Sequence, residues 1–201
     1  MRKLILSTVA ALLVGAAPVA AQSTNFGLGA FAGVSLPIGE FGNTTGAEAG
    51  AAELGFVGGL DLFYPLGMTG LSWLTTASVS AHSVDEDAAG ADSGGYLFIP
   101  LLTGLRYDIA AGPIGAFLTG QAGVVFNKGP EFQALIGPDA NSEWGTEFGF
   151  ALGAGLQATE NVYAGLKYFP LGEVDFSYEG TSGTFSPEVS FLEIFVGFGV
   201  R

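Results

Sequence analysis

Apolar residues alternate with small or polar residues along most of the chain. In residues 149–158, written GFALGAGLQA, Phe150, Leu152 and Leu156 alternate with glycine, alanine and glutamine. Successive side chains of a β-strand point to opposite faces, so this alternation predicts a strand with one apolar face and one small or polar face. Eight such segments occur, at residues 25–37, 53–64, 71–82, 94–108, 113–127, 145–158, 161–176 and 188–201.

The connections between these segments alternate between long and short. The first is the long stretch PIGEFGNTTGAEAGAAE, the second is the short PLGMTG, and the alternation continues to the end of the chain. Long outer loops and short periplasmic turns are typical of transmembrane β-barrels with an even number of strands. The pattern therefore predicts an all-β fold, an eight-stranded antiparallel up-and-down transmembrane β-barrel in which the first strand closes on the last.

The charged residues within the strands indicate which face is outside. The continuous apolar face of each segment carries no charge, and the opposite face carries Asp61, Arg106, Glu147, Lys167 and Glu193. A basic residue on the lipid face near the bilayer midplane costs about 2–4 kcal/mol, whereas a charge in the barrel interior can be paired and hydrated. We therefore expect the apolar face to contact lipid. A soluble, lipocalin-like carrier of eight strands is the alternative fold, and its alternation would run the other way.

Within residues 149–158 this orientation makes a specific prediction. We expect the apolar residues of this segment to face lipid and its glycines to line a narrow lumen, with Gln157 near the periplasmic mouth. The lipid-facing residues are Phe150, Leu152, Ala154 and Leu156, and the lumen-facing glycines are Gly149, Gly153 and Gly155.

The N-terminal segment has the layout of a secretory signal peptide. Arg2 and Lys3 precede an apolar stretch over residues 4–17, and small residues follow up to Ala21. We expect cleavage after Ala21, which divides the chain into a signal peptide (residues 1–21) and a barrel domain (residues 22–201). A retained membrane anchor is the less favoured alternative, because the segment is short and lacks a stop-transfer pattern.

Composition narrows the classes of function. Four basic residues against 19 carboxylates give the chain after Ala21 a net charge of −15, which argues against nucleic acid as a partner. The chain has no cysteine, so it has neither a disulfide framework nor thiolate metal ligands. Glycines in GLGAFAG and FGFALGAGL lie inside expected strands rather than in a strand–turn–helix unit, so no dinucleotide site is expected. We expect no cofactor.

The order of these segments resembles a known family. Eight alternating segments follow a signal peptide, with YLFIPLLTGLRY as the fourth strand and YAGLKYFP as the seventh. This arrangement is similar to the small outer-membrane β-barrel domains of the OmpA/OmpX type. The resemblance implies a place in the bacterial cell outer membrane, with membrane lipid, lipopolysaccharide and the barrel-assembly machinery as partners. Members commonly end in an aromatic residue that this machinery recognises, whereas this chain ends in Gly199-Val200-Arg201 after Phe198.

The five interior charges are the first candidate site. Two interpretations are open, a structural plug and a gated ion path or proton relay. The interior of an eight-stranded barrel is just wide enough for side chains to fill, and large aromatic residues such as Phe117 and Tyr163 face inward, so the plug is favoured. A lone buried charge is costly, so we expect these charges to pair. The predicted structural network is Asp61, Arg106, Glu147, Lys167 and Glu193.

A second candidate involves His82, the only histidine. Together with Ser80 and Glu86 it forms a candidate triad for a lipid-modifying hydrolase. The motif is weak, because neighbouring residues on one strand face do not by themselves make a nucleophile–base pair. A hydrated polar residue at the rim is the favoured interpretation. One histidine and no cysteine make a zinc site a poor fit.

A third candidate is the acidic second long loop. Carboxylates are hard ligands for Ca²⁺ or Mg²⁺, so Asp85, Glu86, Asp87 and Asp92 form a weak candidate cation loop that could bridge to lipopolysaccharide phosphate. A solvated, repulsive rim is favoured over it. We therefore expect a non-catalytic barrel with a structural or surface-interaction role and acidic outer loops. A narrow channel for small solutes is the alternative, and a lipid-modifying enzyme is less favoured.

Overall fold

The structure is a computed structural model that describes residues 26–45, 49–85, 94–109, 114–130, 142–178 and 184–200. The expected signal peptide (residues 1–21) lies outside the described residues and stays a prediction. The same holds for Glu86, Asp87 and Asp92.

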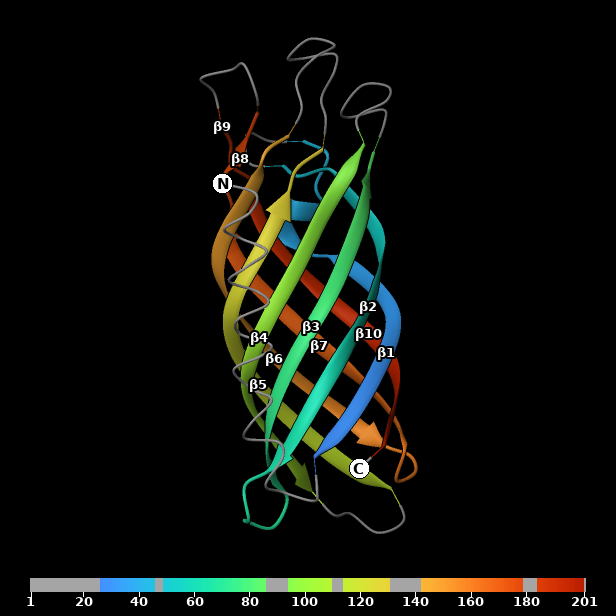
Figure 1. Cartoon of the computed structure of the whole chain (residues 1–201). Coiled ribbons are helices and arrows are strands. Elements are labelled where there is room, and N and C mark those ends of the chain that lie inside the picture. The colour runs from blue at the N-terminus through green and yellow to red at the C-terminus, as the bar shows by residue number, and fades with distance from the viewer. Residues whose placement is uncertain are drawn as a thin grey trace.

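Eight long strands form a closed antiparallel barrel (Figure 1). Each strand joins its neighbour in the chain, and β1 closes on β10 through ten register pairs, from Leu28↔Val200 to Pro37↔Phe191. The predicted fold class is confirmed, and every strand overlaps its predicted segment. The barrel strands are β1 (Gly27–Pro37), β2 (Ala52–Pro65), β3 (Leu71–Val84), β4 (Gly95–Ile109), β5 (Gly115–Lys128), β6 (Trp144–Gln157), β7 (Val162–Glu173) and β10 (Glu188–Val200).

The seventh segment departs from its predicted length. β7 ends at Glu173 rather than at residue 176, because its pairing with β10 shifts by one residue at Leu171 and Gly172 has φ 76°. A positive φ suits glycine, and an extra residue in one strand bends it. The chain then forms a separate hairpin from β8 (Phe176–Ser177) and β9 (Thr184–Phe185) beyond the barrel.

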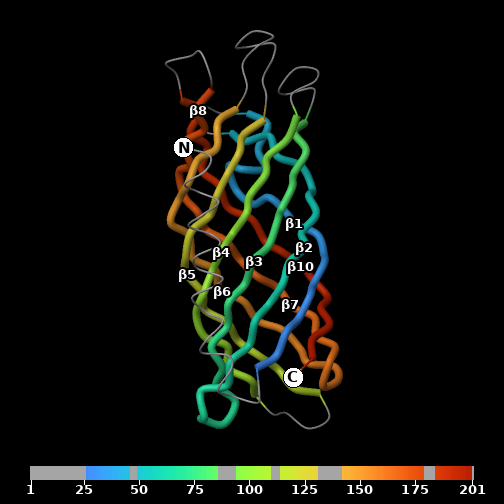
Figure 2. The backbone as a smooth tube through the Cα atoms, viewed as in Figure 1, coloured from blue at the N-terminus to red at the C-terminus, as the bar shows by residue number. Residues whose placement is uncertain are grey.

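The connections divide by length between the two ends of the barrel, as expected. Short connections lie between β2 and β3, β4 and β5, and β6 and β7, at the end where β10 also finishes (Figure 2). The first long connection contains the 3₁₀ helix η1 (Gly39–Gly42). Among the described residues, no helix is long and apolar enough to cross a membrane.

The two faces of the wall have the predicted orientation. Phe56 and Phe148 point outward and are each 73% exposed, whereas the inward residues alternating with them are buried or half-buried. In β6, Phe150, Leu152 and Leu156 are exposed, and Ala151 is buried. Interior glycines make room for large rings, since a Cβ at Gly197 would overlap the ring of Tyr163. The apolar surface is therefore the outside of the protein.

Candidate functional site in the barrel interior

The half of the interior beside the short turns, which the family resemblance assigns to the periplasmic side, holds a polar network centred on Asp61. Thr76 Oγ1 donates to one Asp61 carboxylate oxygen at 2.6 Å, and Tyr163 Oη donates to the other at 2.9 Å. Gln121 Nε2 donates to Thr76 Oγ1 at 2.9 Å. These four side chains come from β2, β3, β7 and β5 and are all buried. The network thus joins four strands across the lumen, and a buried carboxylate is tolerated because both of its oxygens accept hydrogen bonds.

Arg106 forms the second interior group, closer to the periplasmic end. Its guanidinium forms an ion pair with Asp108, with 2.7 Å between Arg106 Nη2 and Asp108 Oδ1. The guanidinium also donates a hydrogen bond to Gln157 Oε1 at 2.7 Å. The guanidinium carbon lies 3.9 Å from the ring centroid of Phe117 and 5.2 Å from that of Phe63. This cation–π packing stabilises a charge that is 1% exposed. Gln157 lies where the sequence placed it, near the periplasmic mouth.

Lys167 and Glu193 form a third group, on neighbouring strands. They are register partners of β7 and β10. Lys167 Nζ lies 5.0 Å from the ring centroid of Phe31 and 5.6 Å from that of Phe195. Within the described residues, its ammonium forms no ion pair as short as 4.0 Å. Glu193 Oε1 accepts a hydrogen bond from Ser80 Oγ at 2.7 Å, and Glu193 Oε2 has no partner there.

The structure places four of the five predicted network residues deep in the interior. Asp61, Arg106, Lys167 and Glu193 are all inward and buried, as the alternation indicates. Arg106 nevertheless pairs with Asp108, which the sequence analysis did not place in the network. Glu147 is on the inward face but only half-buried, and it joins none of these groups among the described residues. Aromatic rings and hydroxyl groups contact most of these charges, and Lys167 and Glu193 are the two of the five that are ladder neighbours, so pairing among all five stays a prediction.

His82 lies in the outer half of the lumen, and its ring is hydrogen-bonded to groups other than Ser80. Its Nδ1 is 3.0 Å from the carbonyl oxygen of Glu53, and its Nε2 is 3.1 Å from Ser35 Oγ. A carbonyl only accepts, so Nδ1 carries the proton, and in the neutral ring Nε2 accepts from the Ser35 hydroxyl. Ser80 instead donates to Glu193. The Ser80–His82 pairing of the candidate triad is therefore wrong, and Glu86 lies outside the described residues.

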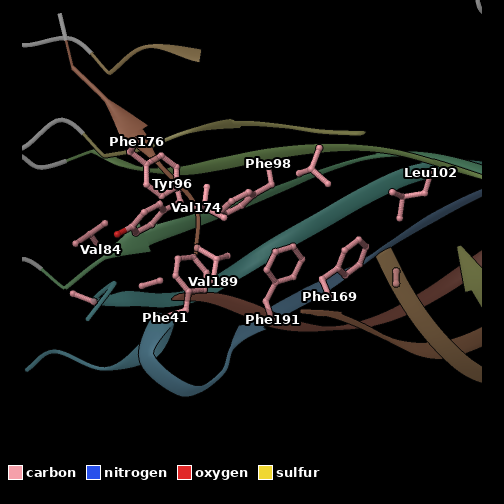
Figure 3. Packing of buried hydrophobic residues seen from close by; sticks show 14 of the residues in the cluster. Phe41, Val84, Tyr96, Phe98, Leu102, Phe169, Val174, Phe176, Val189 and Phe191 are labelled. Atoms are coloured by element: carbon pink, nitrogen blue, oxygen red, sulfur yellow. The ribbon is translucent and has the colours of Figure 1, made fainter. Parts of the chain in front are cut away.

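The outer half of the interior is a cluster of aromatic and aliphatic side chains (Figure 3). Phe41, on η1, is fully buried and packs edge-on against Tyr96 and Phe98, with ring centroids 4.9 and 5.8 Å apart. Phe191 stacks on Phe169 at 4.8 Å. Tyr96 Oη donates to the carbonyl oxygen of Gly50 at 2.6 Å, which fixes the first long connection over the lumen.

Sequence reasoning missed Phe41, because alternation reveals strands and says nothing of a loop that turns back into a barrel. The available signal was an aromatic residue in a loop of glycine, threonine and carboxylates. The consequence is large, since this fully buried ring contacts His82, Tyr96, Phe98 and Phe191 in the outer half of the interior.

The acidic loop is only partly described. The backbone N–H of Asp85 donates to the carbonyl oxygen of Ala51 at 2.9 Å. The other three residues of the candidate cation loop, Glu86, Asp87 and Asp92, are not described. In the described part of the chain, no three or more His, Cys, Asp or Glu residues come together in a group that could hold a metal ion.

A solved structure of a small outer-membrane barrel, Neisserial surface protein A, shares this fold, and two others are similar to it more weakly. Neisserial surface protein A has a TM-score of 0.54 and 17% identity, over 88% of this chain and 96% of that chain. The outer membrane protein OprG of Pseudomonas aeruginosa has a TM-score of 0.46 and 16% sequence identity, over 88% of this chain and 95% of that chain. Ail, the attachment invasion locus protein of Yersinia pestis, has a TM-score of 0.44 and 13% sequence identity, over 88% of this chain and 100% of that chain. No protein-family model and no curated protein sequence matches the chain. The fold is thus that of small eight-stranded outer-membrane barrels.

Proposed function

We propose that this protein is a non-catalytic barrel of the bacterial outer membrane that acts through its outer rim. The observation that carries the proposal is the filled interior. Phe41, Phe98 and Phe191 are fully buried side by side in the outer half, and the Asp61 and Arg106 groups occupy the periplasmic half. A lumen packed in this way holds the barrel together rather than conducting solutes.

The exposed carboxylates of the outer rim support a role in binding a partner at the cell surface. Five of its described carboxylates are exposed, whereas two, Asp108 and Glu160, lie beside the periplasmic turns. An acidic surface attracts basic partners and favours fast encounter with them. We propose a basic protein surface as the partner, and lipopolysaccharide bridged by divalent cations as an alternative partner of the same rim. The exposed rim carboxylates are Glu53, Glu143, Glu173, Asp175 and Glu188.

Two measurements test this function. Planar-bilayer recording of the folded protein should show no conductance steps, and regular steps would overturn the filled lumen in favour of a narrow channel. Vesicles that carry the protein with its rim outward should adhere to a polylysine surface. Exchange of Glu53, Glu173 and Glu188 for glutamine should abolish that adhesion, whereas exchange of Glu160 should not. Equal adhesion of both variants would exclude the rim as the contact surface.

A further inference from the structure

Among the described strands, the longest gap in the ladder of the barrel wall lies between β6 and β7. β6 and β7 pair from Leu152↔Tyr168 down to Gln157↔Tyr163. On the other edge of β6, pairing with β5 extends along the whole strand, from Gly115↔Gln157 to Lys128↔Trp144. We call residues 144–151 and the facing residues 169–176 the open seam, because no ladder pair joins them.

The open seam is bounded at both ends. Above it, Ser142 and Tyr178 form an isolated bridge, and the Glu143 N–H donates to the Ser177 carbonyl oxygen at 2.9 Å. The bridge and the ladder below it keep the same register, so Gly149 and Leu171 would face each other if the ladder were continuous. The seam is therefore a parting between two matched strands, with the backbone edges of both left without ladder partners.

Local sequence explains why the strands part here. Pro170 has no backbone N–H to donate across the boundary. Leu171 is the extra residue in the pairing of β7 with β10, and Gly172 follows with positive φ. The Leu171 side chain turns toward β6, since a Cβ on Gly149 would lie 2.9 Å from Leu171 Cδ2. One leucine side chain thus covers the lower part of the seam.

Polar groups without partners line the upper part. The Asn127 side chain is 1% exposed, and neither its oxygen nor its nitrogen has a hydrogen-bond partner in the described structure. Asn127 is the β5 register partner of Gly145, and its amide lies over the inner face of β6, because a Cβ on Gly145 would overlap the amide oxygen. Glu147 is the next inward residue on β6, half-buried and without a hydrogen bond or ion pair among the described residues. Leaving a buried amide unsatisfied is unfavourable, which indicates a missing partner.

Along the seam, the inner face of β6 is polar in its upper part and apolar in its lower part. Gly145 and Glu147, together with the Asn127 amide, offer hydrogen-bond acceptors, a donor and a negative charge. Below them, Ala151 belongs to the buried apolar cluster, and Leu171 packs against it. On the outside, Trp144 and Phe148 are exposed, so the outer face of the seam is apolar. Lipid cannot satisfy backbone groups, so an occupant with a polar end fits this edge better than hydrocarbon alone.

We propose that the open seam binds a single-chain amphiphile with a cationic, hydrogen-bond-donating headgroup. Its ammonium group is held by Glu147 and the Asn127 amide oxygen, and its alkyl chain runs down the seam against Leu171. Glu147 selects the positive head, because a charge-assisted hydrogen bond is about twice as strong as a neutral one. The source of the ligand is the outer leaflet beside β6 and β7, which the seam faces.

Photolabelling tests the proposal on the folded full chain in phospholipid nanodiscs. The probe is dodecylammonium with a diazirine on its chain, and the label is mapped by mass spectrometry. We expect saturable labelling of residues 144–151 and 169–176 that unlabelled dodecylammonium displaces. A dodecanoate probe with the same diazirine should label them at least about tenfold more weakly. Equal labelling by the two probes would overturn the headgroup assignment, and non-saturable labelling around the whole wall would show contact with bulk lipid only.

A matched pair of variants tests the role of Glu147. Glu147→Gln should weaken dodecylammonium binding about tenfold, because it removes the charge and keeps the shape. Glu160→Gln makes the same change beyond the periplasmic end of β6, where the carboxylate is exposed, and should leave binding unchanged. Equal affinities for both variants would contradict the proposal.

Cross-linking tests whether the seam itself is the site. The chain has no cysteine, so Phe150→Cys with Pro170→Cys introduces one disulfide across the open seam on the lipid face. Pro170→Cys alone forms no disulfide and should keep the labelling, which separates the cross-link from the loss of the proline. Oxidation should abolish labelling and reduction should restore it in the same sample, which separates locking from misfolding. Ala154→Cys with Leu166→Cys joins register partners in the paired part of the same boundary. Oxidation of this control should change nothing, and unchanged labelling of the locked seam would overturn the proposal.

Discussion

The two halves of the barrel interior are filled by different means. The outer half is a packed set of rings, in which Phe41, Phe98 and Phe191 contact one another. The periplasmic half depends on specific polar partners, in which Asp61 accepts from Thr76 and Tyr163. Rings tolerate changes in proportion to the volume lost, whereas a hydrogen-bond network fails when one acceptor is removed. The comparison predicts that substitutions lower the free energy of unfolding for different reasons in the two halves.

The largest expected effect is in the outer half. Phe191→Ala removes a fully buried ring and should lower the free energy of unfolding by about 3–5 kcal/mol, measured by urea titration of the barrel in lipid vesicles. Phe198→Ala is the matched control, because Phe198 is on the same strand and points outward with 56% exposure. If the two variants lose equal stability, the outer half is not a packed core.

In the periplasmic half, Asp61→Ala should cost about 1–3 kcal/mol in total, because two donors lose their acceptor. Asp61→Asn keeps an acceptor oxygen in place and should recover part of the loss. The same urea titration measures both variants. Recovery distinguishes a hydrogen-bond network from simple packing, and identical losses for alanine and asparagine would remove the distinction between the two halves.

The smallest expected effect is at the periplasmic end of the same half. Asp108→Asn breaks the ion pair with Arg106, but the Asp108 side chain is 25% exposed, so solvent screens the interaction. We expect a loss of no more than about 1 kcal/mol, which shrinks in high salt. The rings around Arg106 keep it in place in this variant. A loss as large as that of Asp61→Ala would show that the ion pair, rather than the rings, holds the guanidinium.

The wall was predictable from the sequence, and much of the interior was not. Alternation placed Leu152 outside and Asp61 inside, because the side-chain period of a strand is two and a charge on the lipid face is costly. It could not place Phe41, which reaches the lumen from a loop. Alternation also could not predict hydrogen-bond partners, since Arg106 bonds to Asp108 on its own strand and His82 bonds to Ser35 on β1. Those choices depend on barrel closure and on which side chains meet across the lumen.

The central claim is that the apolar face of the wall is its outside. Leu152→Trp and Leu102→Trp test it in a chain whose own tryptophans, Trp73 and Trp144, are replaced by phenylalanine. Leu152 is 58% exposed on the outer face, and Leu102 is 1% exposed inside. In vesicles of lipid brominated along the acyl chains, the indole fluorescence of the Leu152→Trp variant should be strongly quenched and that of the Leu102→Trp variant only weakly. Equal quenching, or stronger quenching of the inner position, would contradict the account.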